Sequence, residues 1–97
     1  MRVISRATLK AFYGRHADAK GPLEAWFAEA KRAVWREFND IKNRYRSADA
    51  VGENRVVFNI KGNAYRLVVV VHYRVQTVYV RFVGTHAEYD RVDVETV

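Results

Sequence analysis

The chain has 97 residues, which is enough for one domain with one hydrophobic core. Its longest apolar run, Leu67–Val71, is far too short to span a membrane, and the absence of cysteine excludes disulfides and zinc–thiolate sites. Seventeen Lys and Arg against eleven Asp and Glu give a net charge of +6, which favours a polyanionic partner such as RNA, DNA or a ribosome surface.

The first half of the chain predicts a short strand followed by two helices. Met1–Ile4 is expected to form the strand, and because the N-terminus lacks the long apolar stretch of a secretory signal, we expect a cytoplasmic protein. Ser5 is suited to cap a helix that runs to about His16, and Pro22 suits the first position of a second helix. The inward face of that second helix is expected to be Leu23, Trp26, Phe27, Ala30 and Val34.

The second half alternates apolar and polar residues with the period of a β-strand. The expected strands are Arg55–Lys61, Tyr65–Tyr73 and Thr77–Val83. Gly62–Asn63 is suited to a two-residue hairpin turn, and a second turn is expected near Val75–Gln76. The sequence therefore predicts a single α+β domain, residues 1–97, in which two helices pack on an antiparallel sheet of three or more strands.

One face of this sheet is expected to gather polar side chains. If both hairpins have two-residue turns, Asn59 lies opposite Arg66 and His72 lies opposite Tyr79. Strand alternation then gives a polar face formed by Arg55, Asn59, Lys61, Arg66, His72, Tyr79 and Arg81. The core face would hold Phe58, Ile60, Leu67, Val69, Val71, Val78, Val80 and Phe82.

The polar face is both basic and partly apolar. No Asp or Glu occurs between Asn54 and Ala87, so this part of the molecule is uniformly positive. The valines expected on the same face are Val57, Val68, Val70 and Val83. An apolar floor among cations favours a binding cleft or a docking surface over a simply solvated face. For Arg55 and Arg74 we prefer a protective role, because basic residues on exposed strands oppose aggregation.

The segment after the last strand predicts a short helical turn. Thr85 and Glu88 have the spacing of a capping box, and the turn would hold His86 and Tyr89 on one side. A lone histidine is more often structural than catalytic. For a His and a Tyr beside a group of cations, the sequence favours a catalytic role and a structural role about equally. We expect no metal site, because the chain has neither a His-x-x-x-His pair nor a carboxylate cluster.

Several segments resemble the HigB toxin family of the RelE superfamily. They are Phe58–Asn63, Tyr65–Arg66 and Thr85–Asp90, together with Trp35 and Ser47–Asp49 upstream. The resemblance implies a RelE-like fold and a ribosome-dependent mRNA endonuclease. It also implies a helix-turn-helix antitoxin of the HigA type as partner, with operator DNA contacted only through that antitoxin.

The resemblance also suggests which residues form the site. Lys61 matches a lysine at the end of a central strand, and Arg66 matches the arginine that opens the next strand. Arg81, His86 and Tyr89 occupy the region where RelE-like toxins place a basic residue and a C-terminal tyrosine. RelE has a second lysine where this chain has Asn59, and basic residues where it has His86, so the identities of the general base and acid stay open.

These residue types are suited to RNA cleavage without a metal ion. The cations Lys61, Arg66 and Arg81 would stabilise charge on the phosphate oxygens. His86 is the natural general base, because a free imidazole titrates near neutral pH, and Tyr89 could relay a proton or stack on a base. The side chains expected to contact RNA are Asn59, Asn63, His72 and Tyr79.

Two other functions remain open from the sequence. A ParE-like toxin of the same superfamily would inhibit DNA gyrase and would need no catalytic cluster. A non-catalytic RNA-binding module would stack bases on Tyr79 and Tyr89 and hold phosphates with its cations. Single substitutions distinguish a nuclease from an RNA-binding module. An enzyme can lose turnover at one residue, while a binding module loses affinity gradually over several substitutions.

Overall fold

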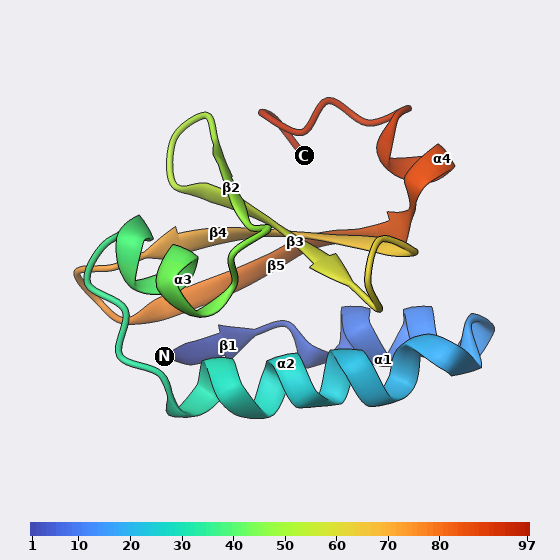
Figure 1. Ribbon diagram of the computed structural model, residues 1–97, viewed down its shortest axis with the longest axis horizontal. Helices are drawn as coiled ribbons and strands as arrows, with labels where there is room; N and C mark the ends of the chain where they lie inside the picture. Colours follow the sequence, from blue (N-terminus) through green and yellow to red (C-terminus); the bar gives the residue numbers. More distant parts are fainter.

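The computed structural model, which describes residues 1–97, has its two longest helices on one side of a single mixed sheet (Figure 1). The strands are β1 (Arg2–Ile4), β2 (Asp49–Val51), β3 (Arg55–Ile60), β4 (Tyr65–His72) and β5 (Thr77–Thr85). The helices are α1 (Arg6–Arg15), α2 (Lys20–Arg32), α3 (Phe38–Arg44) and α4 (His86–Tyr89), with a 3₁₀ turn at Ala17–Ala19. The predicted α+β class is confirmed, while α3 and β2 were not expected.

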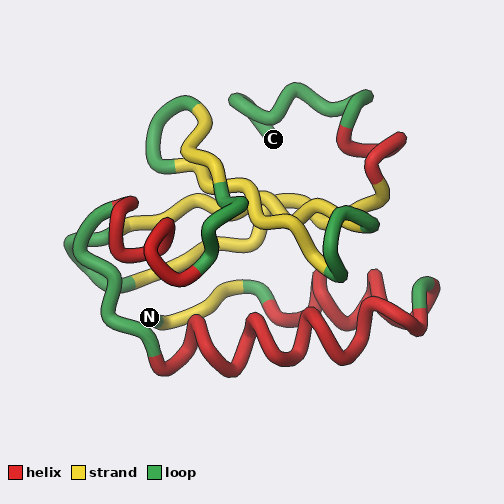
Figure 2. The backbone as a smooth tube through the Cα atoms, in the orientation of Figure 1, coloured by secondary structure: helices red, strands yellow, loops and turns green.

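The sheet has the strand order β1-β5-β4-β3-β2. The pairs from β2 to β5 are antiparallel, whereas β1 runs parallel to β5 and forms one edge. Helices α1 and α2 lie side by side under the sheet in Figure 2, and the C-terminal segment lies on its other side. We call this second side the distal face. None of the helices has the length and apolar composition that a membrane span requires.

The core lies between the sheet and the helices, and its centre is aromatic. The ring of Phe58 lies 5.4 Å from Trp26, 6.3 Å from Trp35 and 5.0 Å from Tyr45, measured between ring centres. Val34 was predicted to face inward but is 64% exposed. The prediction failed because α2 ends at Arg32, so the helical period no longer applies at Val34.

The register of the first hairpin is confirmed. Asn59 pairs with Arg66 and Phe58 pairs with Leu67. The turn differs from the expected one, because the residues with positive φ are Lys61 (53°) and Gly62 (63°), while Asn63 is not among them.

The register of the second hairpin was wrong by two positions. His72 pairs with Thr77 rather than Tyr79, and Tyr79 pairs with Val70. The connection has four residues instead of two, and the Gln76 amide stabilises it by donating to carbonyl oxygens of this turn and of the segment after α2. A shift of two residues keeps every side chain on its expected face. The predicted composition of the two faces is therefore correct near the β4–β5 turn.

A β-bulge in β5 changes the faces at the other end. The pairing shifts by one residue between Val68 and Val69 and leaves Arg81 as the extra residue. Phe82, predicted on the core face, therefore lies on the distal face opposite Val68, and Val83 packs against the core instead. Both predictions were wrong for this one reason, because a bulge inverts the alternation beyond it.

Candidate active site on the distal face

Residues of β3, β4 and β5 form three rows across the distal face. The first row is Asn59, Arg66 and Gly84. The second row is Val57, Val68 and Phe82. The third row is Arg55, Val70 and Tyr79. Two polar rows thus lie on either side of an apolar one, and each polar row holds an arginine from a different strand.

Arg66 is the central side chain of the first row. Its Cζ lies 4.9 Å from the centre of the Tyr89 ring, and the Phe82 ring lies 6.5 Å from that of Tyr89. The Nε of Arg66 and the Oδ1 of Asn59 are buried and have no hydrogen-bond partner. Buried unpaired polar atoms are costly and rare, so this pair points to a site that binds a further group. An arginine beneath an aromatic ring suits a phosphate and the base next to it.

The short helix α4 positions Tyr89 and His86. The predicted capping box is confirmed, since the Glu88 carboxylate accepts from Thr85 N at 2.8 Å and Thr85 Oγ1 accepts from Glu88 N at 3.2 Å. The backbone hydrogen bond from Thr85 holds the pKa of Glu88 below its usual value. His86 Nε2 lies 3.0 Å from the Asn63 side-chain oxygen, which fixes the imidazole over the β3–β4 turn.

Glycine is required beside Arg66 in the first row. A Cβ atom on Gly84 would lie 2.5 Å from the Phe82 ring and 3.0 Å from the Glu88 carboxylate. Any larger residue would push apart the ring and the capping box. Two groups of side chains are joined here through α4: Arg66, Tyr89 and Phe82 beside Asn59, and His86 with Asn63. We call them together the Arg66 cluster: Asn59, Asn63, Arg66, Phe82, His86 and Tyr89.

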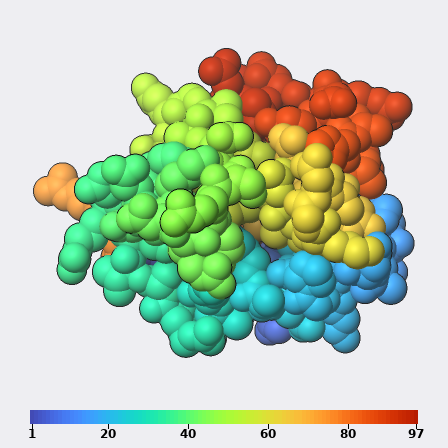
Figure 3. All heavy atoms as spheres, viewed as in Figure 1, coloured from blue at the N-terminus to red at the C-terminus, as the bar shows by residue number.

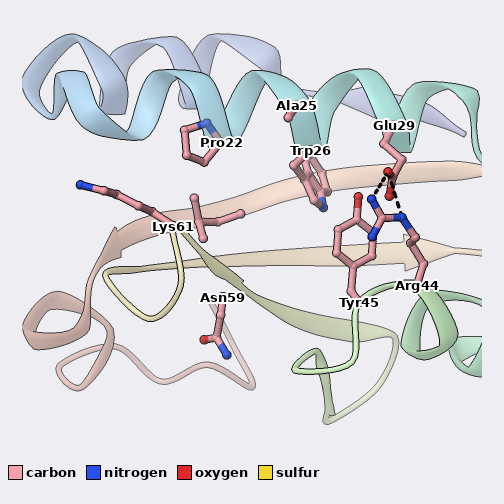
Figure 4. A pocket seen from close by; sticks show the side chains of 9 residues that line it. Pro22, Ala25, Trp26, Glu29, Arg44, Tyr45, Asn59 and Lys61 are labelled. Atoms are coloured by element: carbon pink, nitrogen blue, oxygen red, sulfur yellow. Dashed lines mark hydrogen bonds and ion pairs between the residues drawn. The ribbon is translucent and has the colours of Figure 1, made fainter.

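Lys61 does not share this surface, which corrects the sequence-based expectation. Its Nζ lies 2.6 Å from Oδ2 of Asp18 in the 3₁₀ turn, and Oδ1 of Asp18 accepts from the hydroxyl of Tyr65 at 2.5 Å. In Figure 4, Lys61 extends along the side of the sheet that faces α2, while the Asn59 side chain points away from that helix. The positive φ of Lys61 takes this residue out of the strand alternation on which the prediction depended.

These hydrogen bonds shift the pKa values of Asp18 and Tyr65. The hydrogen bond from Lys61, followed by that from Tyr65, holds the pKa of Asp18 below its usual value. In turn, the hydrogen bond to Asp18 raises the pKa of Tyr65. Lys61 is therefore committed to a carboxylate on the helical side of the sheet.

Arg81, His72 and Tyr79 lie together, but they do so away from the Arg66 cluster. They line a pocket at the third row with Arg55 and Val70. Both arginines of this pocket donate to the carbonyl oxygen of Val97, so Arg55 has a specific contact rather than only the protective role expected of it. The sequence missed this because nothing in strand periodicity locates the last residues of the chain. It also missed Phe82, which the bulge brings to the site.

The structure contains no group of three or more His, Cys, Asp or Glu side chains that could hold a metal ion. The polar side chains of the distal face are instead arginines, asparagines, histidines and tyrosines, which suit anions and bases.

Comparison with known proteins identifies the family of this chain. The family described as the RelE-like toxic component of a toxin–antitoxin system matches residues 19–92. The mRNA interferase toxin HigB of Escherichia coli K12 is 29% identical over 92 residues, which cover 93% of this chain and 88% of the relative. The mRNA interferase HigB of Shigella flexneri matches to the same extent. The chain therefore belongs to the HigB toxin family, the RelE-like toxic components of toxin–antitoxin systems.

Proposed function

We propose that this toxin is an mRNA interferase, an endoribonuclease that cuts mRNA during translation on the ribosome. Membership of the family means that an antitoxin is its partner, and the relatives it matches are named mRNA interferases. The observation that carries the proposal is the Arg66 cluster, in which a half-buried arginine with a buried, unpaired Nε lies between Tyr89 and Asn59. We further propose a HigA-type helix-turn-helix antitoxin, operator DNA reached only through it, and a cytoplasmic location.

The chemistry divides among three side chains. His86 removes the proton from a ribose 2′-hydroxyl, whose oxygen attacks the adjacent phosphorus. Arg66 stabilises the charge that gathers on the phosphate oxygens, a task for which fixed cations in a water-poor site are effective. The 5′-oxygen leaves with a proton supplied by Tyr89, and the products are a 2′,3′-cyclic phosphate and a free 5′-hydroxyl. In this scheme no step requires a metal ion.

Asn63 and Phe82 support these roles. The hydrogen bond between His86 Nε2 and Asn63 Oδ1 fixes the orientation of the imidazole, so one ring nitrogen is held and the other is available. Phe82 and Tyr89 offer ring faces on which an unpaired base can stack. Arg81 and Lys61 receive no catalytic role here, because Arg81 lies in the other pocket and Lys61 lies on the helical side of the sheet.

The experiment that tests the proposal is mRNA cleavage in a reconstituted translation system. Wild-type protein should cut within the translated region only when ribosomes are present. Arg66→Gln should lower the cleavage rate by roughly 10²–10³, the usual effect of removing one group that stabilises transition-state charge. Arg74→Gln is the matched control, because it makes the same change of charge at an exposed turn residue outside the site.

Two outcomes would contradict the proposal. Intact mRNA with active, folded wild-type protein would direct the search to DNA gyrase as the target. Equal cleavage by wild type, Arg66→Gln and Arg74→Gln would move the active site away from the Arg66 cluster. Melting curves of all three proteins establish that each is folded.

A further inference from the structure

Two guanidinium groups converge on one oxygen atom at the third row of the distal face. Arg55 Nη2 lies 3.1 Å and Arg55 Nε 3.4 Å from the carbonyl oxygen of Val97, and Arg81 Nε lies 3.4 Å from the same atom. Neither arginine takes part in any of the four ion pairs of the structure. The main-chain oxygen of Val97 therefore occupies a position in which two cations can hold an oxygen of an anion such as a phosphate.

The rest of this pocket is suited to a nucleobase. The rings of His72 and Tyr79 lie 5.3 Å apart and perpendicular to each other, and Val70 forms the floor between the two arginines. No acidic side chain lines it. Cations beside exposed aromatic rings are the usual means by which proteins bind single-stranded nucleic acid. We call the five lining residues the Arg55 pocket: Arg55, Val70, His72, Tyr79 and Arg81.

The Arg55 pocket lies on the same face as the Arg66 cluster and in line with it. Arg66 and Val70 belong to the same strand, four residues apart, so the two sites are separated by about 13 Å along β4. The row between them is apolar and includes Phe82. A strand of RNA that places one phosphate at Arg66 can therefore pass over this row and place a later phosphate between Arg55 and Arg81.

The chain itself covers this path in the structure. The C-terminal segment returns from α4 over the distal face, and it is the red surface that adjoins the residues around β2 in Figure 3. Val57 and Val68 lie on the distal face and yet are only 4% and 0% exposed. The segment thus fills the position between the two arginines.

We propose that the Arg55 pocket binds a second phosphate and base of the RNA strand that is cut at the Arg66 cluster, and that the segment around Val97 occupies this place until RNA displaces it. The inference rests on the proposed function. It makes Arg81 a binding residue rather than a catalytic one. It also gives the toxin an internal competitor for its own substrate, so productive binding includes the cost of moving the segment away.

The first test measures the affinity for a short RNA in which every 2′-hydroxyl is methylated, so that it cannot be cut. Fluorescence anisotropy is followed from 50 to 200 mM salt, where the slope of affinity against salt reports the number of phosphates contacted. Arg55→Gln and Arg81→Gln should each reduce the slope by about 0.7, the value for one contact to a single strand. Arg74→Gln, with the same loss of charge, should leave the slope unchanged.

The second test follows the C-terminal segment directly. Because the chain has no cysteine, Thr96→Cys gives a single site for a nitroxide label. Electron paramagnetic resonance should show a restrained label in the free protein and a mobile one when the methylated RNA is added. A label at Lys10→Cys, on the exposed side of α1, should not respond.

The outcomes separate this inference from the proposed function. RNA binding at the Arg55 pocket would be refuted if Arg55→Gln and Arg81→Gln gave the same salt slope as Arg74→Gln, or if the wild type did not bind at 50 mM salt. Displacement of the C-terminal segment would be refuted if the mobility of the Thr96→Cys label did not change when RNA is added. Normal mRNA cleavage alongside such results would leave the proposed function standing. Conversely, RNA binding that depends on both arginines in a protein that cuts no mRNA would keep the pocket and refute the nuclease.

Discussion

His86 is the residue whose loss should separate catalysis from binding. His86→Ala removes the proposed general base while leaving Arg66 and the Arg55 pocket intact. We expect cleavage to fall by roughly 10²–10⁴, the usual contribution of a positioned acid or base. Affinity for the methylated RNA should remain close to that of the wild type. A parallel fall in affinity and cleavage would instead describe a binding module whose surface had been damaged.

Substitution of Lys61 tests whether this residue takes part in the reaction, as the sequence predicted, or only pairs with Asp18, as the structure indicates. Because its ammonium group is paired with Asp18 on the helical side, Lys61→Gln should leave the rate of mRNA cleavage near that of the wild type. Cleavage reduced as strongly as by Arg66→Gln would show that Lys61 leaves Asp18 and joins the reaction.

The same variant should change how stability depends on pH. The hydrogen bond from Lys61 holds the folded-state pKa of Asp18 below its usual value, so the ion pair stabilises the protein above the unfolded-state pKa, and this stabilisation is lost as the pH falls through the folded-state pKa. Chemical denaturation between pH 2 and 6 should therefore show a smaller acid loss for Lys61→Gln than for wild type. Arg74→Gln serves as the control for the change in net charge, and it should follow the wild-type curve.

At the scale of single residues, the sequence located side chains well wherever strands are regular. Asn59 and Arg66 are opposite each other as predicted, because the first hairpin keeps its period up to the turn. Lys61 is the residue that leaves that period, with a φ of 53° that only the folded turn reveals. The partnership with Asp18 has no signal in the sequence, since the two residues are 43 positions apart.

Among the elements, α4 is the one that the site depends on most. Thr85→Ala removes the hydroxyl that accepts from Glu88 N, and loss of such a cap costs about 1 kcal/mol of helix stability. We expect α4 to fray and Tyr89 to leave Arg66, with a fall in cleavage but little change in the melting temperature of the whole domain. Hydrogen exchange at the α4 amides measures the fraying directly.

Thr85→Ser is the matched variant, because it keeps the hydroxyl. It should retain both slow exchange in α4 and mRNA cleavage. If Thr85→Ala cleaves as well as Thr85→Ser does, then the capping box does not position the catalytic groups.

The bulge in β5 shows why elements are easier to predict than their alignment. All three strands of the two hairpins were predicted from alternation, and so was the capping box from its spacing. The bulge at Arg81 depends on the pairing of β4 with β5, which no local pattern encodes. Because it reverses the faces beyond Arg81, it decides that Phe82 belongs to the candidate site and Val83 to the core.

The molecule as a whole carries a net charge of +6, and only four of its seventeen Lys and Arg side chains form ion pairs. Under the proposed function, its affinity for the ribosome should fall linearly on a logarithmic scale as salt rises, since binding to RNA phosphates releases counterions. Cosedimentation with ribosomes from 50 to 200 mM salt measures this. Affinity that does not respond to salt would show that RNA phosphates contribute little to docking.

The order of strands in the sheet determines when, during synthesis, the candidate active site of the toxin can assemble. The last strand, β5, lies inside the sheet, between the first strand of the chain and β4, and α4 follows it. Until Thr77–Thr85 has been synthesised, β1 has no neighbour and His86 and Tyr89 do not yet exist, so the nascent chain has no assembled site. Under the proposed function, the ribosome that makes this protein therefore meets no assembled active site until the C-terminal part of the chain has emerged and folded.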